Sequence, residues 1–406
     1  MTSFNALGLA DLDARSGGVE VTPSLDRGEG PSCRAETVRR ITTVIGSLGS
    51  GGAERNLLRL SAALANRGYC VTLITTDPGI DDFYEVPASV SRFRAHPDAH
   101  LSCRWFDLLG QRRRQVALRR CLLETDPDLV ISFLDTVNVA VLLALWRDRV
   151  PVIVSERIDP RFHAVGMRWA VLRGLTYPRA SRVVLQTVDV LPWARSQWPR
   201  WKAESIPNPV VPGRSAAASL VPASASRTVI SLGRLQPQKG FDLLIRAFAA
   251  VAGEFPGWEL TIVGEGPERP ALLRLAETLG VADRVHLTGV VKDPATALAG
   301  GDLFVFASRY EGFPNALAEA MSIGMPVISF DCPSGPSELI RHDVDGLLVP
   351  PQDVGALANA MRRLMPDAGE RARLAARAPE VIERFDAEAI FDRWKRLADD
   401  VLRETA

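Results

Sequence analysis

The sequence between residues 303 and 321 reads LFVFASRYEGFPNALAEAM. Its first four residues are all apolar, as in a strand buried on both faces of a parallel sheet. Gly312 and Pro314 then mark a turn, and the Ala- and Leu-rich segment from Ala316 favours a helix. The stretch therefore predicts a strand, a turn and the start of a helix, which together form one βα unit.

On either side of this stretch, short apolar or β-branched runs alternate with longer segments of helical periodicity from Arg40 onward. Such alternation is typical of βα units around a parallel sheet. The predicted fold class is α/β, with two doubly wound, Rossmann-like domains in tandem. The predicted strands are 41–46, 70–75, 129–133, 151–155, 182–186 and 203–206 in the first domain, and 228–232, 260–263, 285–287, 303–306, 327–329 and 347–349 in the second.

The pattern divides the chain into five segments. Residues 1–35 are predicted to be a flexible leader, because acidic residues are scattered there among Gly, Ser and Pro. Residues 36–207 form the predicted N-terminal domain, and residues 208–227, rich in Ala, Ser and Pro, form a linker. Residues 228–378 form the predicted C-terminal domain. Residues 379–406 form a predicted C-terminal helix that packs back across both domains.

Composition excludes some classes of function. The 406 residues include 48 basic and 48 acidic side chains, so no net positive field is present to hold a nucleic acid. Divided at Ile206, however, the first half carries about +5 and the second about −5. No apolar run approaches the roughly 20 residues that cross a bilayer as a helix. The five cysteines indicate neither a zinc site nor a disulfide framework, and the predicted compartment is the cytoplasm.

The turn after residues 303–306 is the first candidate ligand site. In an open α/β sheet a ligand lies at the carboxyl ends of the strands, where N–H groups at a helix N-terminus receive phosphate or hydroxyl oxygens. Glu311 precedes the predicted helix and Glu319 lies about two turns into it, so the carboxylates suit two separate sets of sugar hydroxyls. Glu319 also stands in an apolar context, where an unused charge would be costly.

Two further segments have the chemistry of an anion site. Arg234 and Lys239 lie after the first predicted strand of the second domain, and a guanidinium and an ammonium there suit a diphosphate. Gly51 and Gly52 lie after the first strand of the first domain, where they let a helix N-terminus approach an anion closely. Neither segment has the spacing of a P-loop or of a dinucleotide-binding loop.

Together these segments resemble the retaining family-4 glycosyltransferases of GT-B fold. The resemblance covers about residue 40 to the C-terminus and includes IPNP at residues 206–209 and the segment 324–349. The segment SERIDP, residues 155–160, is similar to the bacterial branch that extends polysaccharide or lipid-linked oligosaccharide chains. The motifs that carry the resemblance are Gly51-Gly52, Gly233-Arg234-Leu235 with Lys239-Gly240, and the pair Glu311 and Glu319.

The resemblance implies two domains that face each other across a cleft, with the acceptor mainly on the first and a nucleotide diphosphate sugar mainly on the second. A hexosyl group would move with retained anomeric configuration. Arg234 and Lys239 would stabilise the departing diphosphate. Glu319 would bind the ribose, Glu311 the donor sugar. The implied donor-binding residues are Gly51, Gly52, Gly233, Arg234, Lys239, Glu311, Phe313, Pro314, Asn315, Ala316 and Glu319.

The first-domain histidine that is frequent in this family has no direct counterpart after a predicted strand. Glu156 or Asp135 would stand in its place, with His163 as a further candidate that would have to swing in. The implied catalytic residues are therefore Arg234, Lys239, Glu311 and Glu156. No metal or other cofactor is expected, because no D-x-D pair follows the carboxyl end of a predicted strand.

Residues 104–120 and 161–173 combine basic and aromatic residues, which suits helices that lie on an anionic membrane surface. We therefore expect peripheral attachment to the inner face of the cytoplasmic membrane, close to a glycan or lipid-linked acceptor. Two other functions stay open at this point: a nucleotide-sugar epimerase of the same fold and a non-catalytic sugar-nucleotide-binding protein. Release of nucleotide diphosphate only in the presence of an acceptor would separate the transferase from both.

Overall fold

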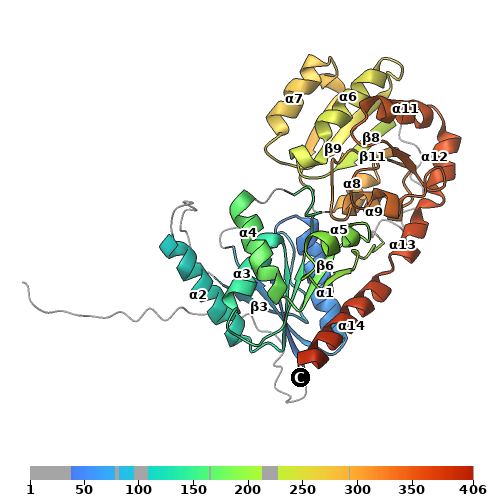
Figure 1. Ribbon diagram of the computed structural model, residues 1–406. Helices are drawn as coiled ribbons and strands as arrows, with labels where there is room; N and C mark the ends of the chain where they lie inside the picture. The colour runs from blue at the N-terminus through green and yellow to red at the C-terminus, as the bar shows by residue number, and fades with distance from the viewer. Residues whose placement is uncertain are drawn as a thin grey trace, which may run out of the picture.

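The computed structural model describes residues 38–77, 82–95, 108–163, 166–212, 227–291 and 293–405. These residues form two parallel sheets, of seven and six strands, flanked by helices (Figure 1). The predicted α/β class with two doubly wound sheets is confirmed. The predicted leader, 1–35, and residues 213–226 of the predicted linker lie outside the described residues.

The first sheet has the strand order β3-β2-β1-β4-β5-β6-β7, and every neighbouring pair is parallel. Its strands are β1 (Arg40–Ile45), β2 (Cys70–Thr75), β3 (Ser91–Arg94), β4 (Leu129–Phe133), β5 (Val152–Ser155), β6 (Arg182–Leu185) and β7 (Ala203–Ser205). Its helices are α1 (Gly52–Asn66), α2 (Leu108–Glu124), α3 (Asp135–Ala144), α4 (Gly166–Thr176) and α5 (Val190–Gln197), with a 3₁₀ turn at Tyr177–Arg179.

The second sheet has the order β10-β9-β8-β11-β12-β13 and is also parallel. Its strands are β8 (Arg227–Leu232), β9 (Trp258–Val263), β10 (Val285–Gly289), β11 (Leu303–Phe306), β12 (Val327–Phe330) and β13 (Leu347–Val349). The helices of this half are α6 (Phe241–Ala252), α7 (Arg269–Thr278), α8 (Pro294–Leu298), α9 (Asn315–Ser322), α10 (Pro336–Leu339), α11 (Val354–Leu364), α12 (Ala368–Ala375), α13 (Val381–Arg384) and α14 (Ala387–Thr405). Short 3₁₀ turns lie at Pro237–Lys239, Ala282–Arg284 and Ala378–Glu380.

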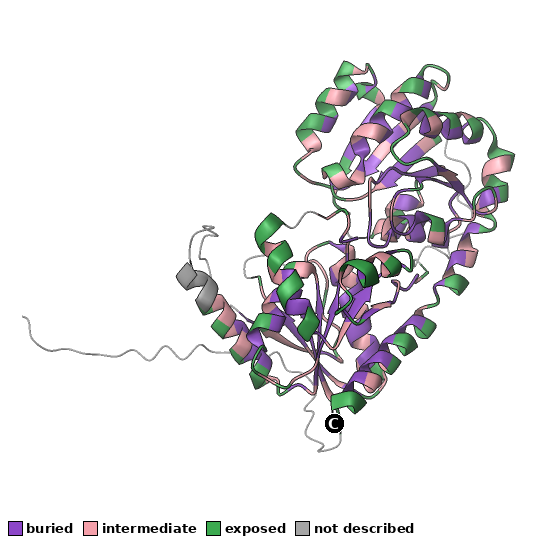
Figure 2. Cartoon of the chain, viewed as in Figure 1, coloured by how far each residue is buried: buried purple, intermediate pink, exposed green. Residues whose placement is uncertain are grey.

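Every predicted strand is present, with ends that shift by at most two residues. The apolar runs were decisive, because strands such as β4, β5, β11 and β12 are buried along their whole length. Figure 2 shows the same buried strands at the centre of each half. The sequence analysis missed β3, an edge strand of composition SRFR that is only partly buried and therefore lacks the apolar signal.

The order of the strands places a ligand crevice in each half. β1 lies between β2 and β4, and β8 lies between β9 and β11, so the chain winds in opposite directions from each of these central strands. In open α/β sheets the ligand lies at the carboxyl ends of the strands at this reversal. The segments after β1, β8 and β11 are the three that carry the predicted site motifs.

The C-terminal helix α14 joins the halves through an apolar face. Trp394 lies 5.9 Å from the ring of Phe133, centroid to centroid, and Asp392 forms an ion pair of 2.9 Å with Arg67 at the end of α1. Burying one large apolar side chain stabilises a fold by about 1.5–3 kcal/mol. The buried residues of α14 are Ile390, Phe391, Trp394, Leu397, Ala398, Val401 and Leu402.

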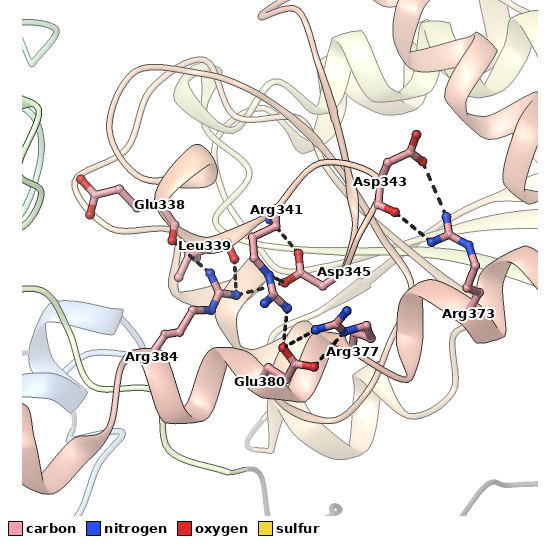
Figure 3. A network of polar contacts seen from close by, with 9 residues as sticks. All are labelled: Glu338, Leu339, Arg341, Asp343, Asp345, Arg373, Arg377, Glu380 and Arg384. Atoms are coloured by element: carbon pink, nitrogen blue, oxygen red, sulfur yellow. Dashed lines mark hydrogen bonds and ion pairs between the residues drawn. The ribbon is translucent and has the colours of Figure 1, made fainter.

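A polar network fixes the chain where it turns from the second sheet toward α14 (Figure 3). Asp345 is fully buried and accepts hydrogen bonds from Arg341, at 2.7 Å, and from Arg384, at 3.2 Å. Arg341 also binds Glu380, at 2.7 Å, and Arg384 donates to the carbonyl of Leu339, at 2.6 Å. Since Leu339 ends α10 and Arg384 ends α13, the network holds two short helices in register.

The predictions about cysteines and membrane spans have different outcomes. Cys121 and Cys332 are free and buried. Cys70 is disulfide-bonded, and the sequence analysis, which found no disulfide framework, did not predict this bond. Among the described helices, none combines the length and the apolar character that a membrane span requires.

Candidate active site

The segment between β11 and α9 places Glu311 at the carboxyl end of the second sheet. The carboxylate is 5% exposed, and its Oε1 accepts hydrogen bonds of 2.6 Å from both Lys239 Nζ and Ser308 Oγ. Lys239 stands in the 3₁₀ turn after β8, so the ammonium and the carboxylate come from neighbouring strands. The structure thus brings together two residues that are 72 positions apart in sequence.

Gly240 allows this approach. Its φ of +63° is a left-handed conformation that favours glycine, and a Cβ at this position would collide with the carbonyl oxygen of Ala307 at the end of β11. A larger residue would therefore push the 3₁₀ turn with Lys239 away from Glu311. Glycine also serves as the N-cap of α6.

Arg234 and the two glycines before and at the start of α1 meet from opposite halves. The Arg234 side chain is 58% exposed, and its Nη2 lies 4.0 Å from Glu54 Oε1. A Cβ on Gly51 would lie 2.6 Å from the same Nη2, and a Cβ on Gly52 would lie 2.7 Å from Asn315 Nδ2. The glycine turn of the first half therefore faces the guanidinium and the α9 N-terminus of the second half.

Glu54 is a residue that the sequence analysis did not select. It lies in the first turn of α1, is 7% exposed, and has a carboxylate oxygen with no hydrogen-bond partner among the described residues. Burial raises the pKa of Glu54, although Arg234 and Arg157 oppose the shift. Its position directly after Gly51-Gly52-Ala53 was the one available signal.

Glu319 is held by the first half of the molecule. Its Oε1 accepts a hydrogen bond from Arg55 Nη2, and the two side chains are 21% and 20% exposed. Burial lowers the pKa of Arg55, with a smaller opposing effect from Tyr84. Arg55 was not predicted, because nothing in the sequence shows which face of α1 meets the second domain.

The segment after β5 reaches across to the turn at residues 311–314. The backbone N–H of Asp159 donates to the carbonyl of Glu311, at 3.1 Å. The Asp159 carboxylate also accepts a hydrogen bond from Ser334. A Cβ on Gly312 would collide with the carbonyl of Arg157, so the two turns are in close contact. Phe313 and Pro314 are buried beneath them, while Asn315 and Ala316 begin α9.

Glu156 lies beneath this segment and does not line its open face. It is 3% exposed, accepts a hydrogen bond of 2.7 Å from Tyr177 Oη, and lies 3.6 Å from Arg173 Nη1. Burial raises its pKa to about 7, although the charge of Arg173 opposes the shift. A carboxylate so placed acts through the groups around it.

His163 and Asp135 stand nearer the surface. His163 Nε2 lies 3.3 Å from Asp135 Oδ2, and the histidine side chain is 34% exposed. The hydrogen bond to Asp135 raises the pKa of His163, against the opposing effect of burial. Burial alone would raise the pKa of Asp135, but His163 lowers it overall. The sequence analysis named both residues only as alternatives to Glu156.

Residues 50–214 match the family described as Glycosyltransferase Family 4, and residues 226–367 match Glycosyl transferases group 1. Sucrose-phosphate synthase from Thermosynechococcus elongatus has the same fold, with a TM-score of 0.77 over 90% of this chain and 100% of its own, at 21% identity. Anabaena HepE, solved with UDP and glucose, has a TM-score of 0.71 over 88% of this chain and 99% of its own, at 23% identity.

Relatives by sequence differ in length. An exopolysaccharide phosphotransferase of Streptomyces coelicolor is 32% identical over 75% of this chain, but the chain spans only 32% of that protein. An N-acetyl-D-galactosaminyltransferase of Campylobacter jejuni, named for an undecaprenol-diphosphate-linked substrate, is 27% identical over 89% of this chain and 99% of its own. An uncharacterized glycosyltransferase of Haemophilus influenzae is 25% identical over 88% of this chain and 99% of its own.

The two parallel α/β sheets and the solved structures that share them define the class of GT-B glycosyltransferases. The two family matches together span most of the chain, one for each sheet. The chain belongs to the family 4 glycosyltransferases, as the sequence motifs predicted.

Proposed function

We propose that the protein is a retaining hexosyltransferase that uses a nucleotide diphosphate sugar and extends a glycan or lipid-linked oligosaccharide in surface polysaccharide biosynthesis. The observation that carries the proposal is the pair of Lys239 and Glu311 at the carboxyl ends of β8 and β11, together with the Gly51-Gly52 turn, which lies against both Arg234 and the first residue of α9. Polymer-building relatives with names from lipopolysaccharide, amylovoran and undecaprenol-linked glycan synthesis support the acceptor class.

In this proposal the donor diphosphate lies between Arg234 and Lys239. Lys239 exchanges part of its contact with Glu311 for a phosphate oxygen, which releases the Glu311 carboxylate to bind hydroxyls of the donor sugar. The N–H groups of Ala316 and Leu317 in the first turn of α9 have no acceptor within the helix and suit a phosphate oxygen, whereas the N–H of Asn315 donates to the carbonyl of Phe313 at 2.9 Å. Gly51 and Gly52 bring the N-terminus of α1 to the same diphosphate from the other side, and Gly233 leaves room for Lys239.

The main catalytic effect is stabilisation of the negative charge that develops on the nucleotide diphosphate as the C1–oxygen bond breaks. Fixed cations and N–H groups in a cleft of low polarity are worth more than the same groups in water. Arg234, Lys239 and the two helix N-termini supply this field, so the proposed reaction requires neither a metal nor another cofactor.

In the first half of the molecule, which we expect to bind the acceptor, we assign His163 to contact the sugar that is transferred. Asp135 holds the imidazole in place. Glu156 remains part of the proposed machinery as a positioning residue: through Tyr177 and Arg173 it fixes the helix α4 and the 3₁₀ turn that follow the His163 segment. This changes the role expected for Glu156 because the carboxylate is buried.

A membrane surface is the proposed site of action. The helix α4 exposes Met167, Val171 and Leu175, which are 82%, 52% and 63% exposed and follow one another at intervals of four residues. Such a spacing places them on one face. Arg113, Arg114 and Arg120 of α2, which packs against α3 as α4 does, suit anionic lipid headgroups. The other predicted stretch lies partly outside the described residues, from 104 to 107.

Three experiments test the proposed function. A thermal-shift panel of UDP-, GDP-, ADP- and dTDP-sugars should identify one donor, because a ligand at 100 times its Kd stabilises the folded state by about 2.7 kcal/mol. Release of nucleotide diphosphate from that donor should then require a glycan acceptor. Release without acceptor at the full rate, or no stabilisation by any donor, would contradict the proposal. Flotation with anionic liposomes at low salt tests the membrane surface, and failure to float would contradict it.

A further inference from the structure

We propose that the side chain of Asn315 is a positioning residue that fixes the two halves of the enzyme against each other at the donor site. This inference rests on the proposed function, in which the N-terminus of α9 receives the donor diphosphate. There Asn315 is only the first residue of that helix. The structure gives its side chain a separate task, because it faces the other half of the molecule.

Three amide side chains from separate parts of the chain meet at this point. Asn315 Oδ1 accepts a hydrogen bond of 3.2 Å from Asn56 Nδ2 in α1 and one of 2.9 Å from Asn208 Nδ2 in the segment after β7. Asn56 and Asn208 are 4% and 2% exposed. A single carbonyl oxygen of the second half therefore satisfies two buried donors of the first.

The orientation of Asn315 is fixed as well. Its Nδ2 donates to the carbonyl of Phe313 at 3.4 Å and would be 2.7 Å from a Cβ on Gly52. The oxygen can therefore face only Asn56 and Asn208. An apolar side chain of similar size would leave both donors unpaired, which is the costly outcome for buried polar groups.

A second link extends this junction into the core of the first half. Asn208 Oδ1 accepts a hydrogen bond from Arg157 Nη2, and Arg157 Nη1 donates to Ser155 Oγ at the end of β5, at 3.2 Å. The guanidinium carbon lies 4.1 Å from the centroid of the Phe133 ring at the end of β4. The hydrogen bonds thus run from the carboxyl edge of the first sheet, through Arg157 and Asn208, to the first residue of α9.

Asn315 therefore links two properties of the enzyme: the donor site at the start of α9 and the position of the first half relative to the second. The backbone of Asn315 stands where the diphosphate binds, and its side chain holds the acceptor half. Loss of the side-chain oxygen should therefore leave the nucleotide site on the second half intact. The first half, which binds the acceptor, should no longer be held in a fixed orientation. Turnover depends on the alignment of both halves, whereas a free nucleotide diphosphate still meets Arg234, Lys239 and the N-terminus of α9 on the second half when the contact from α1 is weakened.

Two variants of Asn315 are expected to fail in opposite ways. Asn315→Leu should lower kcat by at least about tenfold and increase the radius of gyration in small-angle scattering, while the affinity for UDP, GDP or ADP measured by calorimetry changes by less than about threefold. Asn315→Asp retains the oxygen acceptor and should keep the wild-type radius of gyration. Its negative charge beside the diphosphate should weaken binding of the same nucleotides by about tenfold or more.

Asn66→Leu at the exposed end of α1 is the matched control and should change none of these quantities. Equal loss of nucleotide affinity in both Asn315 variants, without a change in radius of gyration, would place the side chain in the donor site and overturn the inference. Wild-type turnover and dimensions in Asn315→Leu would overturn it too.

A stability measurement keeps this test separate from that of the proposed function. If the junction exists, the thermal destabilisation of Asn56→Leu and Asn315→Leu should be less than additive in the double variant, because either change alone breaks the same bond. Additive effects would overturn the inference. This result does not depend on whether any nucleotide sugar is a substrate. Absence of donor binding would therefore contradict the proposed function but not the role of Asn315 between the halves.

Discussion

Arg55 of α1 and Glu319 of α9 form an ion pair between the two halves of the enzyme. Both side chains are about one-fifth exposed, so the pair is only partly screened by water. Glu319 is also the carboxylate to which the family resemblance assigns the ribose of the donor. Contact between the halves and recognition of the nucleoside therefore use the same group.

Replacement of Arg55 by Ala should strengthen nucleotide binding and slow transfer. Without Arg55 both carboxylate oxygens of Glu319 are open to the ribose hydroxyls, and an ion pair of this exposure is worth up to about 1 kcal/mol, or about fivefold in Kd. The value of kcat should fall because the halves lose a contact. Calorimetry with nucleotide diphosphates and steady-state kinetics measure the two effects. Weaker nucleotide binding in Arg55→Ala would contradict the idea that Arg55 and the ribose compete for the Glu319 carboxylate.

Lys239→Ala should reduce both activity and stability. Loss of one cation that stabilises the departing diphosphate should lower kcat by about 10²–10³-fold, as for other transition-state donors. The unpaired Glu311 carboxylate, 5% exposed, would in addition destabilise the fold.

The double variant with Lys239→Ala and Glu311→Gln separates these two effects. It removes the unpaired charge and should restore the Tm toward the wild-type value, but not the activity. Thermal unfolding and initial rates of nucleotide release provide the readouts. If the double variant recovered activity together with stability, Lys239 would have only a structural role.

Sequence patterns predicted the sheets because parallel strands buried on both faces are continuous apolar runs, as in β4 and β11. They predicted Lys239 and Glu311 as separate motif residues, since each follows a strand. Their mutual hydrogen bond depends on the pairing of β8 with β11, and the sequence of neither segment shows which strand it pairs with.

Contacts between the halves were the least predictable part of the site. Arg55 and Asn56 are ordinary helix residues in the sequence, and their roles depend on how α1 is rotated toward α9. The burial of Glu156 had the same origin: the polar sequence SER looks like a loop, but packing of Tyr177 and Arg173 over it removes water. Prediction from sequence was best where the signal was local.

His163→Ala should lower kcat more than Glu156→Gln does. His163 is 34% exposed and oriented by Asp135, whereas Glu156 has no open face. We expect a loss of about 10²–10⁴-fold for His163→Ala, the usual range for a side chain that acts on the reacting group. Asp135→Asn should give a smaller loss and lower the pKa of His163, visible in NMR titration. A larger loss in Glu156→Gln would instead favour Glu156 as the catalytic group.

Glu156 should also leave a signature in the dependence of stability on pH. In the unfolded chain its carboxyl group releases its proton near pH 4.3, whereas burial raises the pKa to about 7 in the folded protein. Between these values the folded state holds one more proton, so the free energy of unfolding falls as pH rises from about 4 to about 7 and is unaffected by this group above that range.

Glu156→Gln removes this titration while an amide oxygen can still accept the hydrogen bond from Tyr177. The free energy of unfolding of the wild type, minus that of the variant, should therefore decrease by an amount on the order of 3 kcal/mol between pH 4.5 and pH 7.5. Urea unfolding at several pH values measures it. His163, whose pKa is also raised, loses its contribution as pH rises through its folded pKa. The part of that rise that comes from Asp135 is common to both proteins and cancels, whereas the part that comes from the charge of Glu156 is absent in the variant. Parallel curves would show that Glu156 titrates near its ordinary pKa in the folded state, and so that burial does not raise that pKa.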